Sequence, residues 1–129
     1  GDPYDVRVNS PAVNDATPVT YQNNTAFATV RNLGDISSIN TKINFYISTN
    51  SIISTGDQLL AVDYSGVLDR NINRIVSEPF QVISEGRYWV GACFDDTYGF
   101  DANIGNNCSN GVEINVTPYD LIYKDSFED

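Results

Sequence analysis

The stretch "GRYWVGACFDDTYGFDANIGNNCSNGVEINV", residues 86–116, decides the fold because two alternating segments flank a polar loop. In the first segment, residues 86–95, one face holds Tyr88, Val90, Ala92 and Phe94, and the other holds Trp89, Gly91 and Cys93. The second segment, residues 108–116, alternates through Val112, Ile114 and Val116. Alternation with a period of two is typical of half-buried strands. The stretch therefore predicts a hairpin with a long loop.

Five further segments predict strands, and no window of 11 residues keeps a helical apolar stripe; they are residues 4–8, 25–32, 41–48, 59–68 and 73–82. Pro11 favours an edge strand that ends early, and Pro79 favours a bulge or an edge position. Gly66 suggests a bend in its strand, whereas residues 49–58 read as a loop. Together these segments predict an all-β chain, an immunoglobulin-like antiparallel β-sandwich of about seven strands. We expect the sandwich to occupy residues 1–118 and an acidic C-terminal tail to occupy residues 119–129.

The length and charge of the chain limit what it does. Its 129 residues suit one domain, and its net charge of −10 opposes binding to nucleic acids or anionic lipids. No run approaches the ~20 apolar residues of a membrane span, so we expect no membrane insertion. The polar start "GDPYDVRVNS" does not read as a signal peptide. These features predict a monomeric, well-solvated module.

Cys93 and Cys108 are the only cysteines, and the chain has no histidine. Two sulfurs alone do not complete a tetrahedral zinc site, and their spacing is not that of a redox motif. A structural disulfide across the hairpin loop fits best, and it implies an oxidising compartment such as the periplasm, the cell surface or the medium. A reduced pair of thiols in a cytosolic core is the alternative.

Several motifs together resemble the CARDB family, immunoglobulin-like modules associated with cell adhesion in bacterial and archaeal surface and secreted proteins. "NFYISTNSIISTGDQLL" (44–60) is similar to the family's "FYLST" and "IST.D.LL" segments, and "VRNLGD" (30–35) to its "V.N.G" turn. "YWVGACFD" (88–95) and "NNCS" (106–109) are similar to its "YYVGACVD" and "NNCS" segments. The resemblance covers roughly residues 5–116, with Asn50 and Ile104 standing at two positions that are usually acidic in the family.

Catalysis by a Ser–His–Asp or Cys–His arrangement is excluded within a chain that has no histidine. The neighbouring carboxylates of the hairpin loop read as a solvated acidic loop, since a small sandwich offers little cleft for a glycosidase pair. Calcium is the sharper hypothesis, because the loop holds five oxygen donors: Asp95, Asp96, Asp101, Asn103 and Asn106. The competing interpretation is that these side chains cap turns.

Aromatic side chains near the hairpin end suggest a second type of site. Trp89, Tyr98 and Phe100 would stack against a carbohydrate, whereas a covered face would make Trp89 structural. The resemblance implies a non-catalytic extracellular module, at a cell surface or secreted, for adhesion or display within a larger bacterial protein. The alternative is an accessory domain of a secreted hydrolase, and the expected partner is a protein or a polysaccharide at a cell surface.

Overall fold

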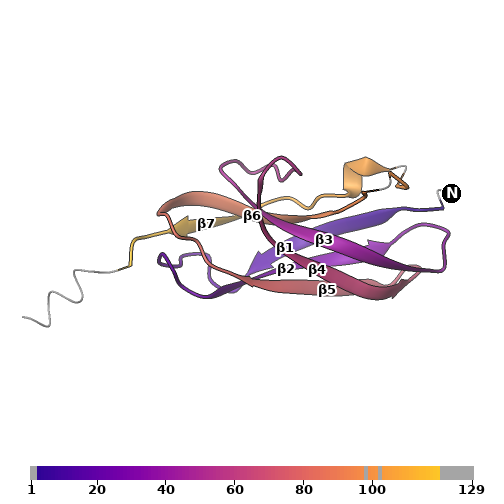
Figure 1. Cartoon of the computed structure of the whole chain (residues 1–129), viewed down its shortest axis with the longest axis horizontal. Coiled ribbons are helices and arrows are strands. Elements are labelled where there is room, and N and C mark those ends of the chain that lie inside the picture. Colours follow the sequence, from indigo (N-terminus) through magenta and orange to yellow (C-terminus); the bar gives the residue numbers. More distant parts are fainter. Residues whose placement is uncertain (1–2, 98, 102, 120–129) are drawn as a thin grey trace, which may run out of the picture.

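Two antiparallel sheets pack face to face in the computed structural model, which describes residues 3–97, 99–101 and 103–119 (Figure 1). The strands are β1 (Val6–Val13), β2 (Asn24–Asn32), β3 (Ser38–Ser48), β4 (Gln58–Asp69), β5 (Asn73–Phe80), β6 (Gly86–Phe94) and β7 (Val112–Val116). One sheet has the order β1-β2-β5 and the other β4-β3-β6-β7. The predicted immunoglobulin-like sandwich of seven strands is confirmed for these residues. None of them belongs to a helix with the length and apolar character of a membrane span.

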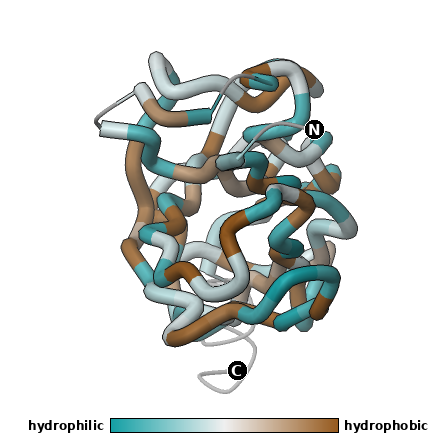
Figure 2. The backbone as a smooth tube through the Cα atoms, turned by 90° about the vertical axis from the view of Figure 1, so that its right-hand side faces the viewer, coloured by the Kyte–Doolittle hydropathy of each residue, from teal (hydrophilic) through white to brown (hydrophobic). Residues whose placement is uncertain are grey.

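The main core lies between the sheets and is built from the inward positions of each strand. Figure 2 shows hydrophobic and hydrophilic residues alternating along much of the backbone. The fully buried large side chains include Phe45, Ile43, Leu68, Ile114 and Val90. Val90, Ala92 and Phe94 of β6 belong to this core, as their alternation predicts, and Tyr88 packs against it. Burial of these faces is the principal force that holds the sheets together.

The strand boundaries correct one prediction and confirm two. β1 does not end before Pro11 but continues to Val13, because a register irregularity between Asn9 and Ala12, with Ser10 at φ 51°, takes up the proline. Pro79 lies in β5, an edge strand, where a missing amide hydrogen is tolerated. β4 is irregular near Gly66, which has φ 70°.

A second, smaller core lies on the outer face of the four-stranded sheet. Tyr46 and Ser48, which alternate with the inward-facing Phe45 and Ile47, lie on that face and are only 6% and 4% exposed. The β3–β4 loop folds over them, and its Ile53 packs with Tyr46, Cys93, Trp89 and Cys108. The loop is held by a backbone hydrogen bond from Gly111 to Ser51 O (3.2 Å). The loop thus acts as a cover rather than as a free connection.

The edges of the sheets are closed by side chains and loops. On one side, Asp63 of β4 accepts a hydrogen bond from the Ser77 amide of β5 (3.1 Å). Arg74 of β5 donates to the carbonyl of Ser65 in β4 (3.1 Å). On the other side, the segment 16–20 runs beside the end of β7, and the Asn115 amide donates to Ala16 O (2.8 Å). These contacts satisfy backbone groups that an edge strand otherwise leaves open.

Gly91 is the residue that lets the loop cover seat on the sheet. A Cβ atom at Gly91 would lie 2.6 Å from Ile53 Cγ1 and 2.7 Å from the carbonyl oxygen of Asn110. We therefore expect Gly91→Ala to lower the free energy of unfolding by about 1–3 kcal/mol, as overpacking does. Urea unfolding measures the change. Gly56→Ala is the matched control, since its nearest contact is Ser54 Oγ at 3.7 Å, and it should change stability by less than about 1 kcal/mol. Equal effects of the two substitutions would contradict the role of Gly91.

Candidate functional site

The hairpin end of the sandwich is closed by a disulfide between Cys93 and Cys108. The two Cα atoms are 4.0 Å apart, and the residues face each other as an isolated antiparallel bridge. Cys93 is fully buried beneath the loop cover. A bond that closes a loop of 15 residues stabilises by roughly 3 kcal/mol on the chain-entropy model. The predicted pairing is present in the structure.

Asp95 and Asp96 start the loop after β6 and are held by internal donors. Asp95 forms an ion pair with Lys42 (3.4 Å) and accepts a hydrogen bond from Thr97 Oγ1 (2.7 Å). The hydrogen bond from Thr97, followed by those from Asn44 and Lys42, lowers the pKa of Asp95 against the effect of burial. The Asp96 carboxylate accepts the amides of Phe100 and Asp101, both at 2.9 Å. Asp96 therefore caps the turn that follows it.

Asp101 connects the loop to the first strand. Its side chain is buried, and Oδ2 accepts the amide of Val6 (2.8 Å) while Oδ1 accepts the amide of Asn103 (2.8 Å). The Asn107 amide fits with its nitrogen donating to Asp101 Oδ2 (2.7 Å) and to Val6 O (3.0 Å). Burial raises the pKa of Asp101, opposed by the hydrogen bonds from Val6 and Asn103, and the nearby Asp5 and Asp96 raise it further. The carboxylate thus pins the hairpin loop to the edge of β1.

The remaining oxygen donors are Asn103 and Asn106. Asn103 is exposed, and Asn106 donates to Asp5 Oδ1 (3.0 Å), while the buried Oδ1 atom of Asn106 has no hydrogen-bond partner. Over the described ranges, no group of three or more acidic, cysteine or histidine side chains is arranged to hold a metal ion. The carboxylates of Asp96 and Asp101 point at backbone amides instead of at one shared position. Turn capping accounts for both of them, and calcium binding stays a prediction.

The predicted aromatic site is divided between two places. Trp89 packs in the outer core, with the Arg87 guanidinium 4.7 Å above its ring. Phe100 is 62% exposed and lies 6.0 Å from the ring of Tyr4, which in turn stacks on Phe94 at 5.8 Å. Tyr98 is outside the described residues. Trp89 and Phe100 do not form one exposed row.

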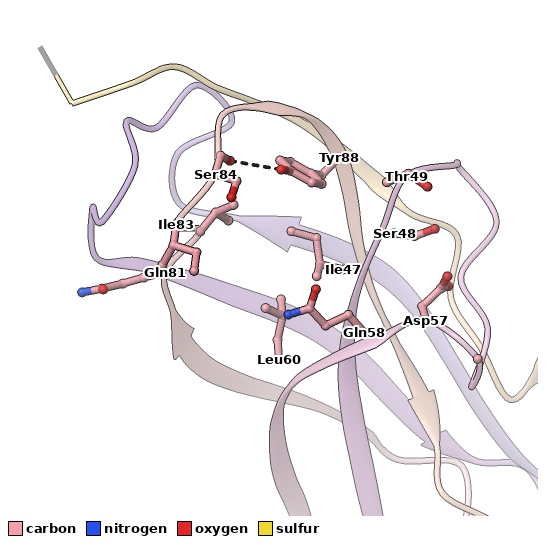
Figure 3. Close-up of a pocket in the computed structure, with 12 residues that line it drawn as sticks. Ile47, Ser48, Thr49, Asp57, Gln58, Leu60, Gln81, Ile83, Ser84 and Tyr88 are labelled. Atoms are coloured by element: carbon pink, nitrogen blue, oxygen red, sulfur yellow. Dashed lines mark hydrogen bonds between the residues drawn. The ribbon is translucent and has the colours of Figure 1, made fainter.

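A cleft that sequence reasoning missed lies at the opposite end of β6, with a volume of about 430 Å³ (Figure 3). The β3–β4 loop and the start of β4 form one wall, and the linker between β5 and β6 forms the other. The lining residues are Ile47, Ser48, Thr49, Gly56, Asp57, Gln58, Leu60, Gln81, Val82, Ile83, Ser84 and Tyr88. In the sequence, the only signs of this site are two glycines: Gly56 lies in one wall, and Gly86 directly follows the linker that forms the other.

The Asp101 contact with β1 leads to a stability prediction. Both carboxylate oxygens of Asp101 accept hydrogen bonds from backbone amides, and Asp101→Asn replaces one of them with an NH2 group that donates. We therefore expect the free energy of unfolding to fall by about 1–3 kcal/mol. Asp69→Asn is the matched control, because it removes the same charge from an exposed position on β4 and should cost less than about 0.5 kcal/mol. Chemical unfolding of both variants at neutral pH gives the difference. Equal stabilities would show that the Asp101 hydrogen bonds contribute nothing beyond their charge.

No protein-family model matches the sequence, and no curated protein matches it. Solved structures do match. The crystal structure of the CARDB domain of a Pyrococcus furiosus protein, in complex with di-metal ions, has a TM-score of 0.67 and 19% identity over 88% of this chain and 89% of that chain. The solution structure of the same domain has a TM-score of 0.68 and 20% identity over 92% of this chain and all of that one (100%).

β-Glucosidases match as parts of larger chains. The enzyme from Erythrobacter marinus has a TM-score of 0.62 and 14% identity, over 88% of this chain but only 16% of the enzyme. The enzyme from Kluyveromyces marxianus has a TM-score of 0.58 and 17% identity, over 88% of this chain and 14% of the enzyme. Identities this low carry the fold alone. The chain has the fold of the CARDB domain, the immunoglobulin-like module that its sequence resembles.

Proposed function

We propose that the chain is a non-catalytic extracellular module that serves adhesion or display within a larger secreted or surface protein. The observation that carries the proposal is the match to CARDB domain structures over nearly the full length of both chains, 88% of this chain and 89% of the crystallised domain. The family that the sequence resembles is associated with cell adhesion. A stiff sandwich with loops at both ends suits a module that holds a contact surface away from its parent protein.

The disulfide and the surface charge support an extracellular location. Cys93 and Cys108 are joined in the structure, and such bonds persist in oxidising compartments. A net charge of −10 keeps the exterior well solvated. Both properties protect a module that works outside the cell.

An accessory domain of a secreted hydrolase is the second candidate. The observation that favours it is the match to β-glucosidases, in which the corresponding region is 14–17% of the enzyme chain. In that setting the module would bind substrate or support the catalytic domain. The two candidates share a non-catalytic role and differ in what they contact.

Adhesion of coated beads separates these candidates. Beads carrying the chain are mixed with intact bacterial cells and with insoluble cellulose, chitin and starch. The control beads carry the same chain after denaturation, reduction and alkylation, so that neither end of the sandwich is folded. We expect more of the beads that carry the folded chain than of the control beads to stay bound to cells. Retention on a polysaccharide alone would favour the accessory domain, and equal retention of both bead types on every surface would overturn both candidates.

Calcium binding by residues 95–106 is a separate proposal, supported by the oxygen donors of this loop and by the di-metal ions bound in the crystal structure of the Pyrococcus furiosus domain. An ion would share the Asp96 and Asp101 carboxylates with the backbone amides that donate to them, since each carboxylate has about four lone-pair sites. A ligand that binds only the folded state raises stability. The proposal therefore requires a higher thermal midpoint in millimolar calcium than in EGTA, and identical midpoints would rule it out.

A further inference from the structure

We propose that the cleft between the β3–β4 loop and the β5–β6 linker binds one or two uncharged sugar units. This inference rests on the proposed function, because it names the class of ligand through which such a module attaches. The volume of the cleft, about 430 Å³, lies within the range of small-molecule sites. The cleft is distinct from the hairpin loop and from the aromatic residues considered above.

The cleft exists because the two sheets part at this end. β3 ends at Ser48, and the loop after it folds outward over the four-stranded sheet, while β5 ends at Phe80 and its chain crosses to the other sheet. Further along, the Asp63–Ser77 and Arg74–Ser65 hydrogen bonds join β4 to β5. The cleft thus lies at the end of β4 that precedes these bridges, where the linker 81–85 leaves β5.

The floor of the cleft is apolar and continuous with the main core. Ile47 is only 7% exposed, and Leu60, Val82 and Tyr88 pack against the core from its rim. Leu60 reaches the floor because the pairing of β3 with β4 skips it: Phe45 faces Ala61 and Tyr46 faces Leu59. Such a floor suits the C–H face of a sugar ring, which gains from leaving water.

The rim carries groups that match hydroxyls. Some polar groups are already committed within the protein: Ser48 Oγ accepts the Asn50 amide (3.1 Å), and Asp57 Oδ2 accepts the Ser54 amide (2.8 Å). Gln58, Thr49 and Ser84 are exposed, and Figure 3 shows the Gln58 amide lying between Ile47 and Leu60. Amides and hydroxyls both donate and accept, as each sugar hydroxyl does.

The charges of the lining select against other small ligands. Among the twelve lining residues there is one carboxylate, Asp57, and no lysine or arginine. A phosphate, a sulfate or a uronic acid would be buried there without a countercharge. A purely apolar ligand would leave the polar rim unpaired, which costs free energy. An uncharged ligand with one apolar face and several hydroxyls satisfies both conditions.

The wall formed by the linker is fixed in place before any ligand arrives. Tyr88 Oη donates to the carbonyl oxygens of Ser84 (3.1 Å) and Glu85 (3.3 Å). Gly86 has φ 150°, and a Cβ atom there would lie 3.2 Å from Tyr88 Oη, so glycine permits this contact. A preformed wall avoids the entropy of ordering a loop on binding.

An extended peptide is the competing occupant, because β4 is an edge strand. The side chains of Asp63 in β4 and Arg74 in β5, which bridge these two strands, occupy the edge beyond the cleft. A peptide could therefore pair with only the first residues of β4. The sugar is the better fit to the cleft.

Amide chemical shifts of the whole chain test the proposal. The probes are glucose, galactose, mannose, N-acetylglucosamine and their disaccharides at millimolar concentrations, with galacturonate as the charged comparison. We expect at least one neutral sugar to shift the amides of Thr49, Gln58, Ser84 and Tyr88, and galacturonate to shift them less. Gln58→Ala should weaken the effective sugar at least about tenfold, the equivalent of one hydrogen bond. Asn115→Ala is the matched control and should change little, since it removes an exposed side-chain amide from β7, outside the cleft.

The proposal is overturned if no neutral sugar shifts these amides, if galacturonate binds as well as the neutral sugars, or if Gln58→Ala and Asn115→Ala weaken binding equally. Shifts produced only by a short apolar peptide would assign the cleft to a protein partner instead. The variants are compared with the parent spectrum, so loss of folding is distinguished from loss of binding. If the beads adhere to cells but no sugar shifts the amides of the cleft, the proposed adhesion function is retained and the proposed sugar binding is rejected.

Discussion

The need to close four strand edges organises this molecule. A sandwich of three and four strands leaves backbone donors and acceptors open along β1, β5, β4 and β7. Three sets of contacts cover these four edges: the Asp101 carboxylate at β1, the segment 16–20 at β7, and the contacts of Asp63 and Arg74 between β4 and β5. Exposed edges invite pairing between molecules, and these contacts leave fewer open backbone groups for such pairing.

The same requirement gives the loops their positions. The β6–β7 loop is joined to β1 by the hydrogen bond from the Val6 amide to Asp101, and the disulfide closes the base of that loop. The β3–β4 loop, in turn, lies over the disulfide through Ile53. Stability at one end of the sandwich is therefore shared among the bridge, the cover and the first strand. The other end of the sandwich holds the cleft, in which we propose that a sugar binds.

The sequence predicted the strands and their faces well, because alternation reports directly on which side chains are buried. It placed Trp89 and Cys93 on the face opposite Val90 and Phe94, and the structure agrees. It did not reveal that Tyr46 is covered, because Ile53 reaches it through a loop without periodicity. Nor did it join Asp101 to Val6, a contact across 95 positions that no local pattern encodes. The cleft was missed for a related reason: the skipped residue Leu60 is defined by pairing and not by composition.

The direction in which the chain crosses the sandwich has a mechanical consequence. β1 begins at one end of the long axis and β7 finishes at the other (Figure 1). A pulling force applied through these two strands acts along them, across hydrogen bonds that run perpendicular to the strands. Those bonds share the load and must shear together, instead of opening one after another as in a zipper. A tether built from this module would resist the pulling force of a flowing liquid through the geometry of its strands. If the hydrogen bonds between the strands broke, the Cys93–Cys108 disulfide would limit how far the chain could extend.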